Sequence, residues 1–325
     1  MRNPPHIAVI GAGIAGLSCA TALQQSGFQV SVFDKSRGPA GRMSTRLGDG
    51  WQCDHGAQYF TARDAGFRAE VARWELAGAA APWYPQVHRF DVGGAGRCAA
   101  DERFVGTPRM TAPAVLLAST LALSTGVPIS ALRRETAGWR LHAQDAGQLE
   151  RCYDSVVLAV PAPQAVPLLR EVAPMQAALA QSVVMPGCWA MMLQYAAPLA
   201  LGFDAAFVNH GPLRWVARDS AKPGRGGVET WLLHASAEWS ERHMELDAAG
   251  VAAPLLAAFA ALGACPPQTW SAHRWRHAST VPARAEVCIW DAGQGLGLCG
   301  DWLNGGTVEA AWLSGRALAH RIAAV

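Results

Sequence analysis

The sequence has few charged residues, almost no lysine and no clustered cysteines, and each scarcity excludes a class of protein. Charged residues make up 16% of the 325 positions, whereas 51% belong to the hydrophobic set AVILMFWYC. This composition excludes an intrinsically disordered chain and a coiled coil. The formal net charge is only +2, so no strong field of one sign predicts binding to nucleic acid or to a membrane surface.

The eight cysteines are dispersed along the chain, without a C-x-x-C pair or a Cys/His spacing typical of metal ligands. They indicate reduced core residues in a cytoplasmic protein that has no metal site. The apolar tract 248–264 contains Pro254 and is shorter than the roughly 20 residues that a bilayer span requires. The sequence therefore predicts no transmembrane segment.

The N-terminal part of the chain has the pattern of a βαβ unit that binds a dinucleotide. A short apolar run, 6–10, precedes Gly11-Ala12-Gly13-Ile14-Ala15-Gly16, and a helical pattern follows as far as Gly27. A second apolar run, 30–33, ends at Asp34, which lies 23 positions after Gly11. A strand, a glycine turn, a helix and an acidic residue at this distance together form the fingerprint.

Each residue type in this motif has a physical role. Gly11 permits a tight turn, Gly13 lets backbone N–H groups approach a pyrophosphate, and Gly16 lets the helix and strand pack closely. The phosphates then lie at the positive end of the helix dipole, and Asp34 accepts hydrogen bonds from ribose hydroxyls. The predicted cofactor contacts of this unit are Gly11, Ala12, Gly13, Ile14, Ala15, Gly16, Asp34 and Lys35.

The motif alone does not distinguish FAD from NAD, but three further segments favour FAD. The loop 35–46 is rich in small and basic residues; it resembles the glycine-arginine stretch of the FAD-dependent amine oxidase superfamily, and a solvated basic loop is the alternative. Segment 296–301 predicts a strand ending in Gly-Asp, and 307–323 predicts an amphipathic helix. Segment 154–161 predicts a buried strand after a hairpin that begins at Ile129.

The chain resembles the renalase-like branch of that superfamily, and its bacterial members in particular. The most specific segment is Asp54-His55-Gly56-Ala57-Gln58-Tyr59-Phe60, and residues 41–46 and 273–278 support it. Gly300-Asp301-Trp302 with Val308-Glu309 completes the resemblance. Between about residues 74 and 270, only the order of the predicted elements agrees.

This resemblance implies noncovalent FAD and an oxidase that returns misreduced nicotinamide dinucleotides to NAD(P). The substrates would be 2- or 6-dihydroNAD(P), with oxygen as the acceptor and hydrogen peroxide as the product. The further FAD contacts that it implies are Gly41, Arg42, Met43, His55, Gly56, Ala57, Gln58, Ile129, Ala159, Pro161, Gly300, Asp301, Thr307, Val308 and Ala311.

On the substrate side the sequence offers aromatic and amide side chains, and no general base is assigned because a dihydronicotinamide is already a hydride donor. For each candidate a purely structural role in the core or in a strand is the alternative. Three arginines, Arg214, Arg218 and Arg225, could meet substrate phosphates or lie at a solvated sheet edge. The substrate-side candidates are Gln58, Tyr59, Trp275, His277 and Trp302.

The sequence departs from the superfamily pattern in one respect that concerns oxygen. Many flavin oxidases of the superfamily place a lysine near the flavin N5, but this chain has only Lys35, beside the ribose site, and Lys222, in a predicted loop. Neither is at a matching position. The sequence therefore does not predict the residue that assists the reaction with oxygen. An FAD-dependent amine oxidase is kept as an alternative, as are an NAD-dependent dehydrogenase and a nonenzymatic FAD-binding protein.

We predict an α/β fold, with a Rossmann-like FAD-binding domain and a discontinuous α+β substrate domain built on an antiparallel sheet. The FAD-binding domain is predicted from residues 1–65, 105–165 and 277–325, and the substrate domain from 66–104 and 166–276. Within these domains we predict strands at 86–91, 189–194, 206–208 and 228–233, and helices at 114–123 and 255–262.

Overall fold

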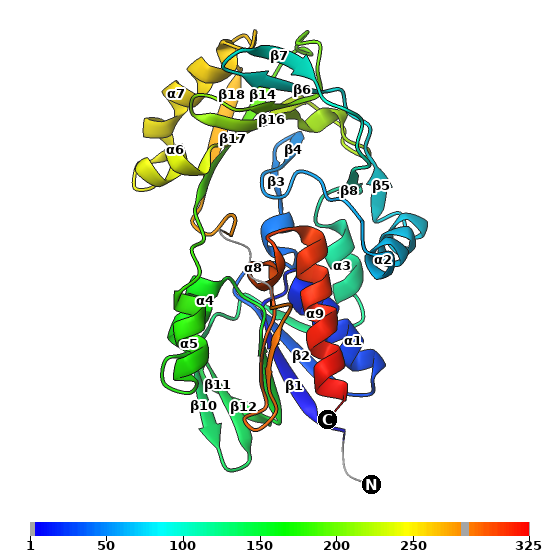
Figure 1. The fold of residues 1–325 in the computed structure, drawn as a ribbon, viewed down its shortest axis with the longest axis vertical. Coiled ribbons are helices and arrows are strands. Elements are labelled where there is room, and N and C mark those ends of the chain that lie inside the picture. Colours follow the sequence, from blue (N-terminus) through cyan, green and yellow to red (C-terminus); the bar gives the residue numbers. More distant parts are fainter. Residues whose placement is uncertain (1–3, 281–285, 325) are drawn as a thin grey trace.

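The computed structural model describes residues 4–280 and 286–324, which form two stacked regions (Figure 1). The lower region is built around a six-stranded sheet and the upper region around a seven-stranded sheet. The lower sheet takes strands from both ends of the chain and also from residues 122–125 and 155–158, whereas the upper sheet takes its strands from residues 87–97 and 188–275. The α/β fold class with a discontinuous second region is therefore confirmed. Residues 1–3, 281–285 and 325 of the predicted domains lie outside the described residues.

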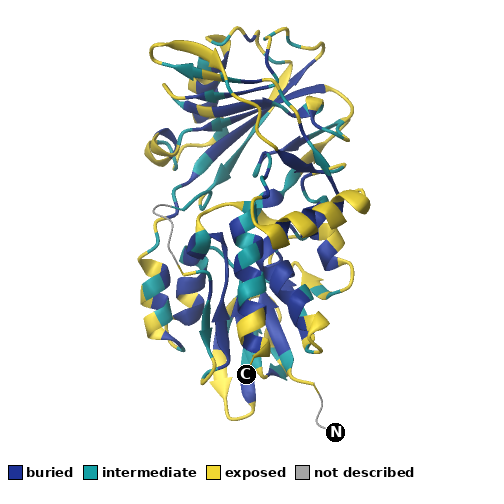
Figure 2. Cartoon of the chain, turned by 45° about the vertical axis from the view of Figure 1, so that its right-hand side comes forward, coloured by how far each residue is buried: buried dark blue, intermediate teal, exposed yellow. Residues whose placement is uncertain are grey.

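The sheet of the lower region consists of β1 (His6–Ile10), β2 (Gln29–Asp34), β9 (Ala122–Thr125), β13 (Ser155–Leu158), β19 (Ile289–Asp291) and β20 (Leu296–Leu298). The strand order is β19-β20-β13-β1-β2-β9, and only the pair β19 and β20 is antiparallel. The central strands are short apolar runs buried on both faces, as a parallel sheet between helices requires (Figure 2).

One face of this sheet is covered by α1 (Ile14–Gln25) and α9 (Val308–Ala323), which pack side by side (Figure 1). Their contact is close, because a Cβ on Gly315 would lie 2.1 Å from the carbonyl oxygen of Ala15. The Ser18 hydroxyl also donates a hydrogen bond to the Trp312 carbonyl at 2.8 Å. The two ends of the chain therefore fold together, as the motifs at both ends predict.

The opposite face of the sheet carries α4 (Ala162–Leu169), α5 (Pro174–Gln181) and the antiparallel strands β10 (Ile129–Glu135), β11 (Gly138–Ala143) and β12 (Gly147–Tyr153). Alternate residues of β1 show the two faces, because Ile7 packs in the α1 core and Ala8 in the α4 core. Leu169 and Ala177 are buried in this second core. The packing therefore places α4 and α5 in the lower region, although the predicted boundary at residue 165 assigned most of them to the substrate domain.

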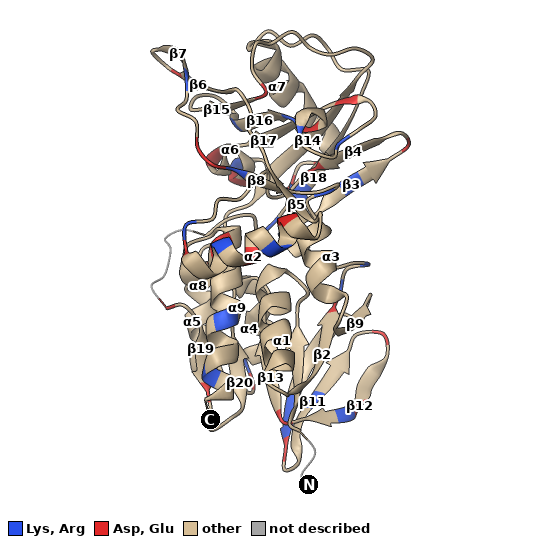
Figure 3. Cartoon of the chain, turned by 90° about the vertical axis from the view of Figure 1, so that its right-hand side faces the viewer, with Lys and Arg blue, Asp and Glu red and all other residues tan. Residues whose placement is uncertain are grey.

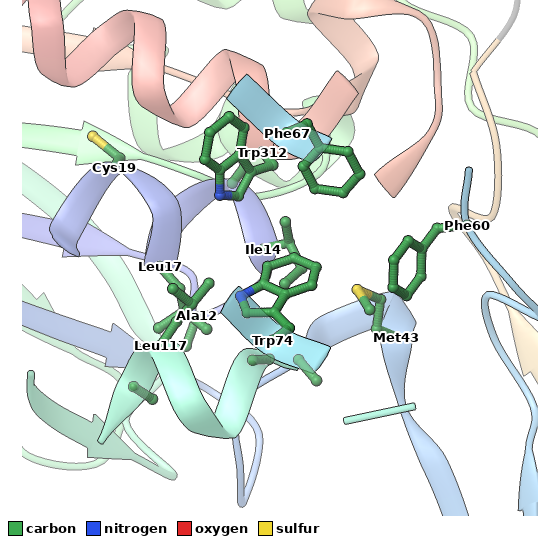
Figure 4. Close-up of a cluster of buried hydrophobic side chains, with 14 of the residues drawn as sticks. Ala12, Ile14, Leu17, Cys19, Met43, Phe60, Phe67, Trp74, Leu117 and Trp312 are labelled. Carbon is green, nitrogen blue, oxygen red and sulfur yellow. The ribbon is translucent and has the colours of Figure 1, made fainter. Parts of the chain in front are cut away.

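The core around α1 continues to α2 (Ala65–Leu76), which it joins to the lower region (Figure 4). The Phe67 ring lies 5.5 Å from the Trp312 ring, measured between ring centroids, and Trp74 is buried beside it. The predicted boundary at residue 65 thus precedes a helix that packs on the lower core. The helix predicted over 114–123 is confirmed only in its first part, α3 (Ala112–Ala118), because residues 122–125 form β9. A short apolar run does not by itself distinguish a helix from a strand.

The upper sheet consists of β6 (Val87–Asp91), β7 (Gly94–Arg97), β14 (Cys188–Tyr195), β15 (Ala205–Val208), β16 (Leu213–Arg218), β17 (Glu229–Ala235) and β18 (Thr269–Trp275). Its order is β18-β14-β17-β16-β15-β6-β7, and it is mixed because β6 and β15 are parallel. The four strands predicted here are confirmed; β7, β16 and β18 were not predicted.

Two helices cover the outer face of the upper sheet, α6 (Ala237–Arg242) and α7 (Ala248–Ala260) (Figure 1). The second of them overlaps the helix predicted over 255–262. Two antiparallel strand pairs lie between the regions: the hairpin of β3 (Thr45–Gly48) and β4 (Trp51–Asp54), and the pair of β5 (Ala80–Pro82) and β8 (Phe104–Gly106). The short helices are η1 (Gly41–Met43), η2 (Asp219–Ala221) and α8 (Asp301–Asn304). Among the residues described, no helix combines the length and apolar character needed to cross a lipid bilayer.

Candidate functional site

The glycine turn between β1 and α1 lies at the carboxyl edge of the parallel strands, where α/β proteins bind nucleotides. Gly11 has a φ of +109°, and a Cβ there would lie 2.5 Å from the carbonyl oxygen of Ala159. A Cβ on Gly16 would lie 1.9 Å from the carbonyl oxygen of Gly11. By contrast, a Cβ on Gly13 would meet no protein atom within 4 Å. Gly11 and Gly16 are therefore required by packing, whereas Gly13 borders open space in which a phosphate fits.

Two further loops stack on this turn through backbone contacts. The N–H of Ala40 donates to the carbonyl of Ala12 at 2.9 Å, and the N–H of Ala57 donates to the carbonyl of Arg42 at 2.9 Å. A Cβ on Gly56 would lie 2.0 Å from that Arg42 carbonyl oxygen. The loops that contain Gly13, Gly41 and Gly56 are thereby held together by backbone contacts; close packing excludes a side chain at Gly56, and the φ of +54° at Gly41 favours glycine.

Arg42 joins these loops to the C-terminal part of the chain. Its guanidinium forms a bidentate ion pair with Asp301, in which Nη1 lies 2.9 Å from Oδ2, and it also reaches the Ala278 carbonyl at 3.4 Å. The preceding Gly300 N–H donates to the Ser314 hydroxyl of α9 at 2.9 Å. The arginine and the aspartate that were predicted to contact the cofactor are thus adjacent, although 259 residues separate them.

Asp34 is oriented by backbone donors at the end of β2. Its carboxylate accepts hydrogen bonds from the N–H groups of Ala12 and Ser36, both at 2.7 Å. The N–H of Val127 donates to the Asp34 carbonyl at 2.9 Å and brings the start of β10, with Ile129, to the same place. The neighbouring Lys35 is exposed and contacts Gln164 at 3.0 Å. The predicted adenosine-side residues are therefore brought together.

The other predicted cofactor residues line this edge in different ways. Ala159 and Pro161 follow β13 directly, and the Ala159 N–H donates to the Ile10 carbonyl at 2.8 Å. Thr307 caps α9 by accepting from the Ala310 N–H at 3.1 Å. The side chains of Ile14 and Met43 are buried in the core, so only their backbone atoms are available to a ligand. Val308 and Ala311, which are partly buried, lie in the first turn of α9.

Gln58 is engaged inside the protein. Its Nε2 donates to the carbonyls of Asp54 and Gly56, the second at 3.2 Å, and its Oε1 accepts from Lys222 Nζ at 3.3 Å. The side chain is buried, so the structural interpretation of Gln58 is favoured over an amide contact to substrate. Tyr59 packs between Trp83 and Trp215 with the guanidinium of Arg103 above its ring, at 5.1 Å from the centroid.

Below Gln58 lies a cluster of four buried charges that we call the junction cluster: Asp54, Asp219, Lys222 and Arg225. Lys222 Nζ is 3.1 Å from Asp54 and 2.8 Å from Asp219, and all three side chains are fully buried. Arg225 donates to Asp54 and, at 2.6 Å, to the Gly106 carbonyl. Lys222 was predicted in a loop and does follow η2 directly. Its side chain is nevertheless among the most buried of the described residues.

The pKa values in the junction cluster are shifted in both directions: that of Asp54 is lowered, and those of Asp219 and Lys222 are raised. Burial raises the pKa of Asp54, but Lys222 and Arg225 outweigh this effect and bring the pKa to about 2. Burial and the Asp54 charge raise the pKa of Asp219. Burial lowers the pKa of Lys222, but its two carboxylate neighbours outweigh burial and raise it. The cluster was not predicted, and its one sequence signal is a lysine in a chain that has only two.

A group of imidazole and indole rings lies between β18 and the loop after β4. The Trp275 Nε1–H donates to the His55 carbonyl at 2.8 Å, and the two rings are stacked with centroids 5.1 Å apart. His273 packs edge-on against both rings. Burial, with the nearby cations and imidazoles, lowers the pKa of His55 to about 3, and burial lowers that of His234 to about 4. These rings are therefore neutral at pH 7.

Trp275 and His277, two substrate-side candidates, are partly exposed next to the glycine loops. The indole of Trp275 lies 3.4 Å from the position of a Cβ on Gly56. His277 has a pKa lowered by burial and by the cations Lys35 and Arg42. Trp302, in contrast, is 1% exposed, and its Nε1–H donates to the Val160 carbonyl at 3.1 Å. It packs in the core of the lower region and forms no wall of an open pocket, which corrects its prediction.

The three arginines considered for substrate phosphates already have partners. Arg218 pairs with Glu229 at 2.9 Å, and Arg225 belongs to the junction cluster. Arg214 is exposed and donates to the Asn209 side chain at 2.6 Å. Arg218 and Arg225 line a surface cavity of about 440 Å³ at the edge of the upper sheet, which also contains Glu229. The carboxylate in this cavity disfavours a phosphate there.

Known proteins share this fold and this N-terminal motif. A family model described as an NAD(P)-binding Rossmann-like domain matches residues 9–73. The chain is 46% identical over 51 residues to a zeta-carotene-forming phytoene desaturase of Myxococcus xanthus and 41% identical over 56 residues to an L-amino-acid oxidase of Bothrops pauloensis. These matches cover 16% and 17% of this chain but only 10% and 11% of the relatives, so the chain matches about a tenth of their length.

Solved structures agree with the chain over its whole length. A protein described as a protoporphyrinogen oxidase from Exiguobacterium sp. 255-15 matches with a TM-score of 0.81 at 13% identity, covering 100% of this chain and 99% of that one. Putrescine oxidase bound to putrescine gives 0.78 at 15% identity, and cyclohexylamine oxidase from Brevibacterium oxydans IH-35A gives 0.75 at 12%, each covering 99% of both chains. The chain therefore has the amine oxidase-like fold, a Rossmann-like domain joined to a mixed-sheet domain.

Proposed function

We propose that this protein is an FAD-dependent oxidase that returns the 2- or 6-dihydro isomers of NAD(P)H to NAD(P). The proposal combines the fold with one observation, that all four sequence segments carrying the renalase-like resemblance meet at one place. Arg42 pairs with Asp301, Arg46 contacts His273, and His55 stacks on Trp275. The Glu309 carboxylate accepts from the N–H groups of Arg63 and Asp64, both at 2.7 Å. Packing alone does not require such distant segments to share one site.

The residues at the edge of the lower sheet fit FAD. The open space beside Gly13 and the cation of Arg42 suit a diphosphate, and Asp34 suits the adenosine ribose. The N-terminus of α9, with its cap at Thr307, suits the electron-rich edge of an isoalloxazine. None of the cysteines described is placed for covalent attachment in this interpretation, because Cys299 is buried directly after β20. Noncovalent FAD is therefore proposed.

FAD supplies the two-electron chemistry: the substrate loses a hydride, oxygen is reduced to hydrogen peroxide, and the second proton comes from water. What the protein must supply is orientation and a dry surface for a flat ring. Trp275 and the neutral His55 form such a surface beside the Gly56 turn. The lowered pKa values of His55 and His234 make both imidazoles weak bases, which suits a hydride transfer that needs no general base.

The test is anaerobic stopped-flow reduction of the purified yellow protein. We expect 2-dihydroNAD or 6-dihydroNAD to bleach the flavin absorption within the first turnover, and ordinary 4-dihydroNAD to do so far more slowly. Readmission of oxygen should restore the absorption and release one hydrogen peroxide per substrate. A protein that purifies without flavin, or a flavin that none of the dihydro isomers reduces, contradicts the proposal.

A second candidate is an FAD-dependent amine oxidase, which the likeness to putrescine and cyclohexylamine oxidases favours. The same stopped-flow measurement distinguishes the two functions. If the protein is an amine oxidase, primary or secondary amines will bleach the flavin absorption. Reduction by amines alone would replace the first proposal with the second.

A further inference from the structure

Arg46 is an exposed cation that forms no ion pair with a carboxylate of the described residues. It lies on β3, and its Nη2 is 3.3 Å from the Nδ1 atom of His273 on β18. Figure 3 shows β3 and β18 next to each other in the upper part of the molecule. Within the described residues, no ion pair joins Arg46 to an Asp or Glu, whereas the nearby Arg274 and Arg276 both contact Glu245. An arginine without a counter-charge at a domain junction is well suited to bind an anion.

The contact between Arg46 and His273 fixes where the histidine proton lies. A guanidinium can only donate, so the Nδ1 atom of His273 must accept and its proton lies on Nε2. Burial and the Arg46 charge lower the pKa of His273, which agrees with a neutral ring. His273 therefore offers a second N–H donor next to the guanidinium. The buried Nδ1 atom of His55, in the ring that packs on His273, has no hydrogen-bond partner among the described residues.

The spacing of these groups matches a nucleotide. His273 and Trp275 are two residues apart on β18, so both project from the same face, and their ring centroids are 4.5 Å apart. The Arg46 guanidinium contacts the His273 ring, so a ribose would bridge a nicotinamide at Trp275 and a phosphate at Arg46. The Trp275 and His55 rings lie beside the Gly56 turn, and His273 packs edge-on against both of them.

We infer that Arg46 and His273 bind the phosphate on the nicotinamide ribose of the substrate, while the nicotinamide ring lies toward Trp275. This inference rests on the proposed function and identifies which part of the substrate is recognised. It assigns Arg46 a binding role for the substrate rather than for FAD, whose diphosphate lies at Gly13 and Arg42. The site therefore requires a nucleotide, since a nucleoside lacks the recognised group.

The experiment compares three reduced substrates, the 2-dihydro forms of NAD, of nicotinamide mononucleotide and of nicotinamide riboside. For the Arg46→Gln variant we expect the KM of both phosphorylated substrates to rise about tenfold and the KM of the riboside to stay unchanged. The rate of flavin reduction at saturation should not change, because a phosphate contact is equal in the ground state and the transition state. Arg46→Lys should recover part of the affinity.

The controls separate the possible failures. Arg68 on α2 is another exposed arginine, and it pairs with Glu102. The Arg68→Gln variant should leave all three KM values unchanged. Loss of bound flavin from Arg46→Gln would mean that the arginine serves the cofactor, and an unchanged or uniform effect on the three substrates would also overturn the inference. If the wild-type flavin is reduced by none of the three, the proposed function itself fails and the inference with it.

Discussion

The two sides of the candidate site are held in different ways. On the lower side, three loops around Gly13, Gly41 and Gly56 are joined by backbone hydrogen bonds and by the absence of side chains. At the junction with the upper region, the loop after β4 is held by the junction cluster, in which Asp54, Asp219 and Lys222 are wholly buried. The glycine loops depend on local backbone geometry, whereas the junction cluster depends on charge balance in the protein interior. Different substitutions should therefore disrupt the two sides.

The largest effect is expected from removing the cation of the junction cluster. Lys222→Met leaves Asp54 and Asp219 buried with only Arg225 to balance them, and breaking a buried pair in this way costs about 3 to 5 kcal/mol. Chemical denaturation followed by tryptophan fluorescence measures the change in unfolding free energy. Lys35→Met, which removes the other lysine of the chain from an exposed position, is the matched control and should change stability by less than about 1 kcal/mol. Similar losses in both variants would show that the cluster contributes no special stability.

In the glycine turn between β1 and α1, a substitution at Gly13 should weaken FAD binding without unfolding the protein. Gly13→Val places its side chain in open space, so the apoprotein should keep its melting temperature while FAD affinity falls on the order of 100-fold, or about 3 kcal/mol. Gly16→Val, whose Cβ would lie 1.9 Å from the Gly11 carbonyl oxygen, should prevent folding. Flavin absorption after dialysis and thermal unfolding of the apoprotein separate the two. Retained flavin in Gly13→Val would show that the diphosphate lies elsewhere.

The lowered pKa values of the histidines at the junction predict that the protein becomes less stable as the pH is lowered. The folded pKa of His234 is about 4, whereas an unfolded histidine has a pKa of about 6.5, so the unfolded chain binds more protons between these values. The contribution is full above about pH 6.5 and is lost as pH falls through 4, amounting to roughly 3 kcal/mol at most. His234→Gln should flatten the dependence of unfolding free energy on pH, and His320→Gln at the exposed end of α9 should not. A wild-type stability that is constant from pH 7 to 5 would contradict buried neutral imidazoles here.

The smallest effect concerns Trp302, which the sequence suggested as part of the substrate pocket. Trp302→Phe removes the hydrogen bond to the Val160 carbonyl and a little core volume, at a cost of about 1 to 2 kcal/mol in stability. Because the ring is buried in the lower core, the KM for reduced substrate should not change. Trp275→Phe, altered in the same way beside the Gly56 turn, should raise the KM. Equal changes in KM for the two variants would return Trp302 to the substrate pocket.

Much of the lower region was predictable because its signals are local. The glycine turn, the helix α1 and the acidic end of β2 all lie within the first 34 residues, where strand, turn and helix patterns follow directly from residue type. The strands of the upper sheet were predictable for the same reason, apart from β7, β16 and β18. The helix predicted over 114–123 included residues 122 and 123 of β9, since only pairing with β2 decides that this short run is a strand.

The sequence motifs and their positions along the chain thus determined the glycine turn between β1 and α1, the fold class and the helices and strands that carry the candidate residues. Only the tertiary structure decided which of those residues meet: Arg42 with Asp301, Lys222 with Asp54, and Trp302 with the core instead of a pocket. The physical reason is that dihedral preferences and apolar periodicity act within a few residues. Ion pairs and burial depend on groups more than 140 residues apart, whose partners are defined only when the two sheets have packed.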